Sequence, residues 1–359
     1  MISTPKQRIG ILGAGQLALM LAQAADPLHI DILCAGQPGD CAGQIATVQS
    51  VDLDNAAAVA AFSAQTDLVT IESENIHADV LQSLHLYPNA RAIAIAQDRL
   101  LEKQFFQTCG IGTAPFAPVD SLEALQRAMG TTGLPAILKT RRMGYDGKGQ
   151  VRLRDHADAQ AAWSEVGSVP CILEGMVNFE AEVSLIAVRG RSGQLVFYPL
   201  VQNHHRDGIL RTSIAPFVDE SLQQQAELYL KNLLQSLDYV GVLAVEFFVV
   251  DGKLLANEMA PRVHNSGHWT IEGSQTSQFE NHLRAIAGLE LGSTASRPTV
   301  MLNCIGKMPT AADTAAFPQL FRHDYGKESR PGRKVGHLTF PAAEVAAIAH
   351  WQQRLQASI

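Results

Sequence analysis

The stretch KTRRMGYDGKGQ, residues 139–150, places glycines between cationic side chains. Glycine adopts backbone conformations that other residues avoid, so such a loop can fold over a ligand. Its backbone N–H groups and Lys148 would then neutralise part of the charge of a polyphosphate. It is not a P-loop, because no Gly-Lys-Ser or Gly-Lys-Thr sequence follows. A phosphate-covering loop is the functional interpretation, and a hairpin loop whose charges face water is the alternative.

The segments around this loop predict a small α+β lobe over residues 115–174. Strands are expected over residues 136–139 and 150–153, and a helix over residues 121–129. The chain then continues with further expected elements: strands over 182–189, 195–200, 240–250, 253–258 and 299–306, and a helix over 221–237.

The N-terminal residues predict the beginning of a doubly wound parallel sheet. A strand over 8–12 is followed by a glycine turn, a helix over 16–25 and a second strand over 30–35. A later strand over 68–71 ends in polar residues, where ligands of such sheets bind. The turn fits the dinucleotide pattern G-x-G-x-x-A, but no acidic residue ends the second strand, which argues against NAD. A sugar-phosphate contact through the turn's amides and a purely structural tight turn both stay open.

Length and composition limit the classes of protein that need considering. With 359 residues, 47% of them hydrophobic, the chain can form two or three domains with real cores. The net charge of −7, without long runs of like charge, argues against nucleic-acid and membrane binding. The five scattered cysteines form no CxxC pair, and the apolar stretch 9–25 fits a strand, turn and helix better than a signal peptide. We therefore expect a cytoplasmic protein.

Two acidic positions flank the turn Asp251-Gly252 of an expected β-hairpin. A two-residue loop would place Glu246 opposite Asn257 and send Glu258 to the other face. A three-residue loop would instead put Glu246 diagonal to Glu258 on one face. Carboxylates must share a face to hold Mg²⁺ together, so the metal site requires the three-residue loop. Charges in so apolar a strand are costly to bury unpaired, which favours the metal site.

Other polar segments are candidates for binding smaller groups. Residues 260–269 bring cationic, imidazole and amide donors together, which could hold a small anion or could be satisfied polar groups of a connecting loop. Glu174 and the residues after it end a predicted strand and could meet a purine, with Glu182 near a ribose. In the turn at residues 203–208, we expect one of two adjacent histidines to face a ligand.

Taken together, these features resemble the ATP-grasp superfamily. Four motifs narrow the resemblance to the 5-(carboxyamino)imidazole ribonucleotide synthases of purine biosynthesis: GYDGKGQ (144–150), DGILRTS (207–213), NEMAPRVHNSGHW (257–269) and RPGRKVGH (330–337). This resemblance implies an ATP-grasp fold with an N-terminal Rossmann-like domain over 1–97, an ATP-grasp domain over 98–295 and a C-terminal domain over 296–359. It also implies an ATP-dependent ligase that carboxylates 5-aminoimidazole ribonucleotide with bicarbonate, through carboxyphosphate, and is a homodimer.

The resemblance also assigns roles to individual residues. Contacts to ATP are implied for Arg99, Lys139, Gly144, Tyr145, Asp146, Gly147, Lys148, Gly149, Gln150, Glu174, Gly175, Met176, Val177, Glu182, His205, Asn257 and Glu258. Mg²⁺, as two ions, would be held by Glu246 and Glu258. Bicarbonate or carboxyphosphate would be held by Arg262, His264 and Asn265. The ribonucleotide would touch Gly15, Gln16, Leu17, Glu74, Tyr145, Asp146, Lys327, Arg333 and Lys334.

The chain departs from the family's usual pattern at its first two motifs. Ala18 and Leu19 replace a glycine and an arginine, and we expect both to lie on the buried side of their helix. Ser73 stands where an aromatic or aliphatic residue is usual, which weakens the assignment of Glu74. Within the superfamily the alternative is a formate-dependent glycinamide ribonucleotide formyltransferase, which residues 262–269 disfavour. A nicotinamide oxidoreductase and an inactive nucleotide-binding regulator are the alternatives from other classes.

Overall fold

The computed structural model describes residues 6–144, 148–314, 317 and 319–341. Its N-terminal part is a parallel four-stranded sheet in the order β3-β2-β1-β4. The strands are β1 (Arg8–Leu12), β2 (Asp31–Gly36), β3 (Thr47–Ser50) and β4 (Leu68–Ile71). The helices are α1 (Gln16–Ala25), α2 (Ala56–Ser63), α3 (Ala78–Leu81) and α4 (Ala90–Ala96), with short 3-10 turns η1 (Asp26–Leu28) and η2 (Cys41–Gln44). The doubly wound beginning is thus confirmed.

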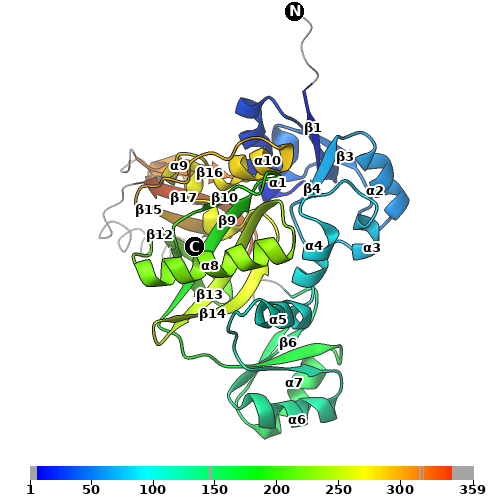
Figure 1. Ribbon diagram of the computed structural model, residues 1–359, viewed down its shortest axis with the longest axis vertical. Helices are drawn as coiled ribbons and strands as arrows, with labels where there is room; N and C mark the ends of the chain where they lie inside the picture. Colours follow the sequence, from blue (N-terminus) through cyan, green and yellow to red (C-terminus); the bar gives the residue numbers. More distant parts are fainter. Residues whose placement is uncertain (1–5, 145–147, 315–316, 318, 342–359) are drawn as a thin grey trace, which may run out of the picture.

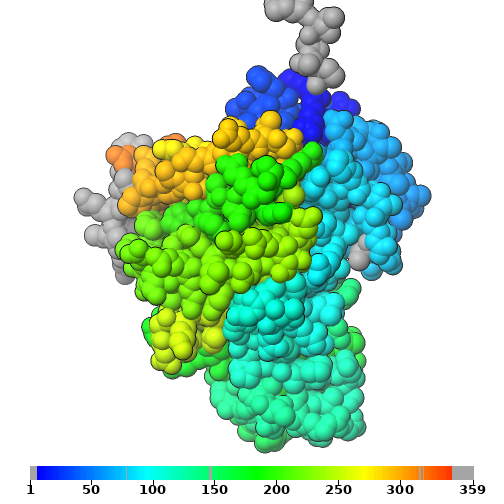
Figure 2. Space-filling view, in the orientation of Figure 1, coloured from blue at the N-terminus to red at the C-terminus, as the bar shows by residue number. Residues whose placement is uncertain are grey.

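Helix α5 (Arg99–Thr108) leads from this part into the small lobe, which projects from the body of the molecule (Figure 1, Figure 2). Its sheet is antiparallel in the order β5-β8-β6-β7. The elements are β5 (Phe116–Val119), α6 (Leu122–Thr132), β6 (Ala136–Thr140), β7 (Gln150–Leu153), η3 (His156–Asp158), α7 (Ala159–Glu165) and β8 (Cys171–Gly175). A compact apolar core that includes Leu125, Leu138 and Leu173 holds the lobe together.

A nine-stranded sheet forms the body, in the order β14-β13-β9-β11-β12-β15-β17-β16 with β10 beside β9. Its strands are β9 (Ala181–Arg189), β10 (Leu195–Phe197), β11 (Val201–Arg206), β12 (Ile209–Ala215), β13 (Gly241–Val250), β14 (Lys253–Ala260), β15 (Thr299–Ile305), β16 (Phe321–Asp324) and β17 (Lys334–Pro341). The helical segments are α8 (Glu220–Ser236), η4 (Asn265–Gly267), α9 (Thr270–Gly273), α10 (Gln278–Ala287) and α11 (Ala311–Thr314). The C-terminal strands therefore extend the central sheet.

The β13–β14 hairpin corrects the expected register. Asp251 and Gly252, at φ 47° and 68°, form a two-residue loop, and Val250 pairs with Lys253. Both positive φ angles are those of the tight turn that suits a twisted hairpin. The three-residue loop is therefore wrong. The carboxylates still share a face, because the register shifts beside Phe247 and Glu246 lies opposite Glu258, with Asn257 as the extra residue.

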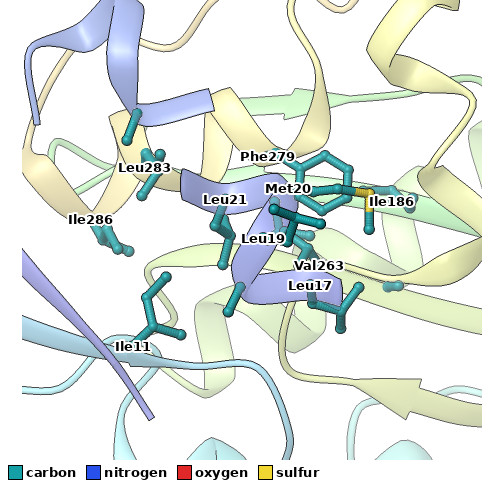
Figure 3. Packing of buried hydrophobic residues seen from close by; sticks show 14 of the residues in the cluster. Ile11, Leu17, Leu19, Met20, Leu21, Ile186, Val263, Phe279, Leu283 and Ile286 are labelled. Atoms are coloured by element: carbon teal, nitrogen blue, oxygen red, sulfur yellow. The ribbon is translucent and has the colours of Figure 1, made fainter. Parts of the chain in front are cut away.

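The N-terminal domain is packed firmly against the body. Helix α1 lies on α10, and Leu21, Met20, Phe279, Leu283 and Ile286 form one buried cluster (Figure 3). Ala18 and Leu19 are 0% and 3% exposed, as expected for the buried side of α1. Within the described part of the chain, no helix is long and apolar enough to cross a membrane.

Candidate functional site

A cleft of about 730 Å³ opens where the small lobe, the N-terminal domain and the central sheet meet. Most of the residues predicted from the sequence line it: Gln16, Leu17, Glu74, Arg99, Lys139, Gly144, Gln150, Glu182, His205, Glu246, Asn257, Glu258, Arg262, His264, Asn265 and Lys334. Segments far apart in the sequence are thus brought to one place. This convergence makes the cleft the candidate active site.

The other predicted residues stand differently. The described residues Gly15, Lys148, Gly149, Glu174, Gly175, Met176, Val177, Lys327 and Arg333 are not part of the cleft lining. Among them, Glu174 accepts a hydrogen bond from Lys139, and Lys327 donates one to Gln16; Lys139 and Gln16 both line the cleft. Tyr145, Asp146 and Gly147 lie outside the described residues.

The carboxylates of Glu246 and Glu258 form the acidic face of the cleft. Arg99 donates to Glu258 Oε2 at 3.0 Å. Burial alone would raise the pKa of Glu258, but Arg99 and Lys139 outweigh it and lower that pKa. Burial, and then the charge of Glu258, raise the pKa of Glu246. Two carboxylates that face each other, with a raised pKa on one of them, form an arrangement that a divalent cation would stabilise.

A buried ion cluster holds Lys139, the lysine predicted to contact the phosphates of ATP. Lys139 and Lys103 lie 3.1 and 3.3 Å from the same Glu174 oxygen. Lys103 is only 1% exposed, and its ammonium group also donates to Ala256 O at 3.3 Å. Burial alone would raise the pKa of Glu174, but the two lysines lower it. Glu174 thus fixes Lys139 through its side chain, a role that sequence analysis did not anticipate.

Two backbone N–H groups just after Glu174 already donate hydrogen bonds within the small lobe. The N–H groups of Gly175 and Met176 donate to Pro115 O and Pro135 O at 2.8 and 3.0 Å. Any backbone contact to a purine must therefore use other groups of this segment. Shortly after this segment, Phe179 stacks on Phe248 with ring centroids 4.8 Å apart, and both line the cleft.

Glu182 and His205 form an ion pair on β9 and β11, with Nδ1 and Oε2 2.6 Å apart. Burial alone would lower the pKa of His205, but the hydrogen bond with Glu182 and the nearby Glu246 raise it. Of the two adjacent histidines, His205 lines the cleft and His204 is exposed, so His205 is the one in a position to face a ligand.

The segment after β14 carries the predicted anion-binding side chains. Arg262 forms a bidentate pair with Glu74, at 2.5 and 3.1 Å. The amide of Asn265 is engaged with Asn303, each donating to the other at 3.0 and 2.6 Å. Burial and the charge of Arg262 lower the pKa of His264 to about 3. All three line the cleft, and each has a hydrogen-bond contact with a neighbouring side chain, which for His264 is the hydroxyl of Ser266.

Glu72 contacts the glycine turn, for which the sequence left open a sugar-phosphate contact or a purely structural role. Its carboxylate accepts the N–H of Gly15 at 2.6 Å and of Ala18 at 3.0 Å, at the beginning of α1. A Cβ at Gly13 would stand 2.2 Å from this side chain, and one at Gly15 would stand 2.8 Å from it. The glycine turn therefore receives a carboxylate of the chain itself where a nucleotide phosphate would sit in a dinucleotide-binding domain. This contact joins β4 to α1 and leaves no local mark in the sequence.

Cationic side chains from the start of β17 and from the loop before it lie near the N-terminal side of the cleft. Lys334 lines the cleft, and Lys327 donates to Gln16 Oε1 at 2.5 Å. Burial lowers the pKa of Lys327. Arg333 donates to Glu328 O at 3.4 Å. The structure thus brings Lys334, Lys327 and Gln16 together at the junction of the two domains.

Three protein-family models match successive segments of the chain, which correspond to the N-terminal domain, the small lobe with most of the central sheet, and the C-terminal strands. Residues 6–97 match a ribonucleotide synthetase preATP-grasp domain, residues 104–279 an ATP-grasp domain, and residues 299–350 a phosphoribosylaminoimidazole carboxylase C-terminal domain. Among curated proteins, the N5-carboxyaminoimidazole ribonucleotide synthase of Pseudomonas aeruginosa is 50% identical over 95% of this chain and 96% of its own length.

Solved structures agree. The N5-carboxyaminoimidazole ribonucleotide synthetase of Thermus thermophilus has a TM-score of 0.91 at 48% identity, covering 97% of this chain and 98% of that one. The enzyme of Aspergillus clavatus, solved with ADP and 5-aminoimidazole ribonucleotide, has a TM-score of 0.87 at 28% identity and covers 98% of both chains. The resemblance and the fold class predicted from the motifs are confirmed: the chain belongs to the N5-carboxyaminoimidazole ribonucleotide synthase family of ATP-grasp enzymes.

Proposed function

We propose that this chain carboxylates the exocyclic amine of 5-aminoimidazole ribonucleotide with bicarbonate, at the expense of ATP. The observation that carries the proposal is the convergence in one cleft of paired carboxylates, phosphate-binding cations and the segment from Arg262 to Asn265. ADP and the same ribonucleotide are bound in the Aspergillus clavatus relative. The same reaction is the one for which the family is named.

The proposed chemistry begins with bicarbonate, which is a poor electrophile. A bicarbonate oxygen attacks the γ-phosphorus of ATP, ADP leaves, and carboxyphosphate forms. The amine nitrogen then forms a bond to the carboxyl carbon, the carbon–oxygen bond to phosphate breaks, and the amine loses a proton. The protein's part is to bring the reactants together and exclude water, because carboxyphosphate is short-lived in water.

Arg99 and Lys139 would hold the phosphates of ATP, since both are cationic and line the cleft. Glu182 would meet the ribose and Asn257 would lie beside the phosphates. Glu246 and Glu258 fit Mg²⁺, which prefers oxygen ligands and takes its remaining ones from phosphates and water. When bound, Mg²⁺ neutralises charge on the transferring phosphoryl group.

The ribonucleotide would lie between the N-terminal domain and the central sheet. Gln16, Leu17, Glu74 and Lys334 line this part of the cleft, which supports the assignment. Lys334 is a cation suited to a 5′-phosphate. Since Glu72 occupies the turn amide of Gly15, the contact proposed for Gly15 would be through neighbouring groups. Tyr145, Asp146 and Arg333 remain proposed contacts by family resemblance.

A homodimer, a cytoplasmic location and domain boundaries near residues 97 and 296 also belong to this proposal. The location is supported by the cysteines, since none of the five is in a disulfide.

The test is ADP release by the purified protein with Mg²⁺, ATP, bicarbonate and 5-aminoimidazole ribonucleotide, omitting each in turn. We expect ADP formation that requires the ribonucleotide and falls in bicarbonate-depleted buffer. In the same assay Lys334→Ala should raise the KM of the ribonucleotide far more than that of ATP. ADP release that ignores the ribonucleotide would overturn the proposed substrate.

A further inference from the structure

The backbone of His264 is clamped from both sides by one buried glutamine. His264 N donates to Gln278 Oε1 at 2.9 Å, and Gln278 Nε2 donates to His264 O at 2.6 Å. Gln278 is 0% exposed at the beginning of α10, whose other end packs into the domain core. These two hydrogen bonds fix the backbone of His264, the residue that precedes η4, independently of the contacts of its side chain.

The ring of His264 is held at Nδ1. As the N-cap of η4, its Nδ1 accepts the backbone N–H of Ser266 at 3.3 Å, and the Ser266 hydroxyl lies 2.9 Å from the same nitrogen. A backbone N–H can only donate, so Nδ1 must present its lone pair. A neutral ring with an unprotonated Nδ1 carries its proton at Nε2.

A line of buried polar groups reinforces this assignment. Ser184 donates to Ser266 Oγ at 2.8 Å, Asn203 Nδ2 donates to Ser184 at 2.9 Å, and Ser213 donates to Asn203 Oδ1 at 2.8 Å. Ser184, Ser213 and Ser266 are each 0% exposed. With Nδ1 unprotonated, the Ser266 hydroxyl can donate its hydrogen to His264 Nδ1 while its oxygen accepts from Ser184.

The opposite edge of the ring belongs to the cleft. His264 lines the cleft, and its Nε2 lies 3.7 Å from Glu246 Oε1, beyond hydrogen-bond distance. Arg262, two residues earlier, also lines it. An Nε2–H group here faces the place where the proposed function puts bicarbonate and the carboxyl group in transfer.

We propose that Ser266, backed by Ser184 and Asn203, is a positioning residue that holds His264 in its Nε2–H tautomer, so that His264 donates a hydrogen bond to an oxygen of the transferred carboxyl group. The inference rests on the proposed function for the identity of that group. A fixed donor aimed at an oxygen that gains charge favours the transition state without any reorganisation of the site. In this role His264 does not accept the proton of the attacking amine.

The tautomer is measured without any substrate. Long-range ¹H–¹⁵N correlation spectra of the protein labelled with [¹⁵N]histidine distinguish the two ring nitrogens, and loss of a signal set in His264→Gln assigns the residue. We expect an unprotonated Nδ1 and a protonated Nε2. A proton on Nδ1, alone or on both nitrogens, would overturn the proposal.

Two pairs of variants test the consequence for turnover. Gln places an amide N–H near the position of Nε2 and Asn places one near that of Nδ1, so His264→Gln should retain roughly tenfold more kcat/KM for bicarbonate than His264→Asn. Ser266→Ala should raise the KM of bicarbonate several-fold and leave that of ATP unchanged. Thr70→Val is the matched control, since it removes an equally buried hydroxyl that contacts His282 and lies outside this line of polar groups.

Each outcome bears on one claim. Equal losses in His264→Gln and His264→Asn, or equal effects of Ser266→Ala and Thr70→Val, would contradict the positioning role. Ribonucleotide-independent ADP release by the wild-type protein would instead contradict the proposed function, and the tautomer would still be decided by the spectra.

Discussion

Glu246 and Glu258 face each other across the β13–β14 pair, and their environments differ. Glu258 has Arg99 as a partner at 3.0 Å, whereas Glu246 has His264 at 3.7 Å. The pKa of Glu246 is therefore raised by burial and by its neighbour, while that of Glu258 is lowered. A cation bound between them would remove this difference, which is the electrostatic reason for assigning a metal to this face.

Glu258→Gln keeps the shape of the side chain and removes its charge. If Glu258 is a metal ligand, turnover should fall by roughly 10²- to 10³-fold, because charge stabilisation of the transferring group is lost. The circular dichroism spectrum should stay unchanged. Glu165→Gln, at an exposed carboxylate of α7, is the control and should have wild-type turnover. Near-normal turnover of Glu258→Gln would remove this residue from the site.

The Glu182–His205 pair predicts a defined pH dependence of stability. The pKa of His205 is raised in the folded protein, so the pair's contribution is fully present below the ordinary histidine pKa of about 6.5 and is lost as pH rises through the raised pKa. Urea unfolding should show His205→Asn to be less stable than wild type by about 1 kcal/mol at pH 5.5, and the difference should vanish in alkali. In a Glu182→Gln background this pH dependence should be absent. A difference that grows with pH would contradict the assignment.

At the scale of elements, the hairpin illustrates what a sequence pattern can and cannot predict. The apolar run over residues 240–250 and the Asp-Gly pair after it predict two strands and a turn, which the structure contains. The bulge at Asn257 depends on how β14 meets β13, so nothing local to residues 253–260 announces it. The shared face of the two glutamates was expected, but from a loop that does not occur.

The contacts of Glu72 and Lys103 could not be predicted for a related reason. Each joins elements that are distant along the chain: β4 to α1 for Glu72, and α5 to β8 and β14 for Lys103. In the sequence Lys103 resembles one more charged residue of an amphipathic helix, although it is 1% exposed. Most residues recognised by motif line the cleft, whereas Glu72 and Lys103, whose contacts hold the glycine turn and the ion cluster of Glu174, were missed.

Lys103→Met tests the buried ion cluster between α5 and the small lobe. Removing one partner of a buried pair costs up to roughly 3–5 kcal/mol, and here Glu174 would lose its ion pair with Lys103 and keep the one with Lys139. We expect a lower free energy of unfolding and a higher KM for ATP, measured by urea denaturation and ADP release. The double variant Lys103→Met, Glu174→Leu should recover stability but not ATP affinity, because an apolar pair leaves no buried charge. A double variant less stable than the single one would refute this account.

At the scale of the whole molecule, the apolar cores show which parts move together. One buried cluster contains residues of α1 and α10 and so joins the N-terminal domain to the body (Figure 3). The small lobe has a separate cluster made only of its own residues. We therefore expect the small lobe to be the part that closes over a bound nucleotide, because its apolar core is not shared with the rest of the molecule.

Two leucine substitutions separate these cores. Leu21 and Leu125 are both 0% exposed, and alanine at either position should cost roughly 2–5 kcal/mol. Amide hydrogen exchange in Leu125→Ala should accelerate in β5 to β8 and stay unchanged in β1 and β13. Leu21→Ala should instead accelerate exchange in both the N-terminal domain and the body. Faster exchange throughout the molecule in Leu125→Ala would show that the lobe shares a core with the rest.

The measurement that tests the central claim most directly is the fate of oxygen in [¹⁸O]bicarbonate. If bicarbonate attacks ATP and the resulting carboxyphosphate transfers its carboxyl group to the ribonucleotide, the phosphate released in each turnover carries an oxygen from bicarbonate. Mass spectrometry of the phosphate should then show ¹⁸O, in an amount equal to the ADP formed and only when the ribonucleotide is present. Phosphate without ¹⁸O alongside steady ADP release would mean that water attacks ATP, and would contradict the account.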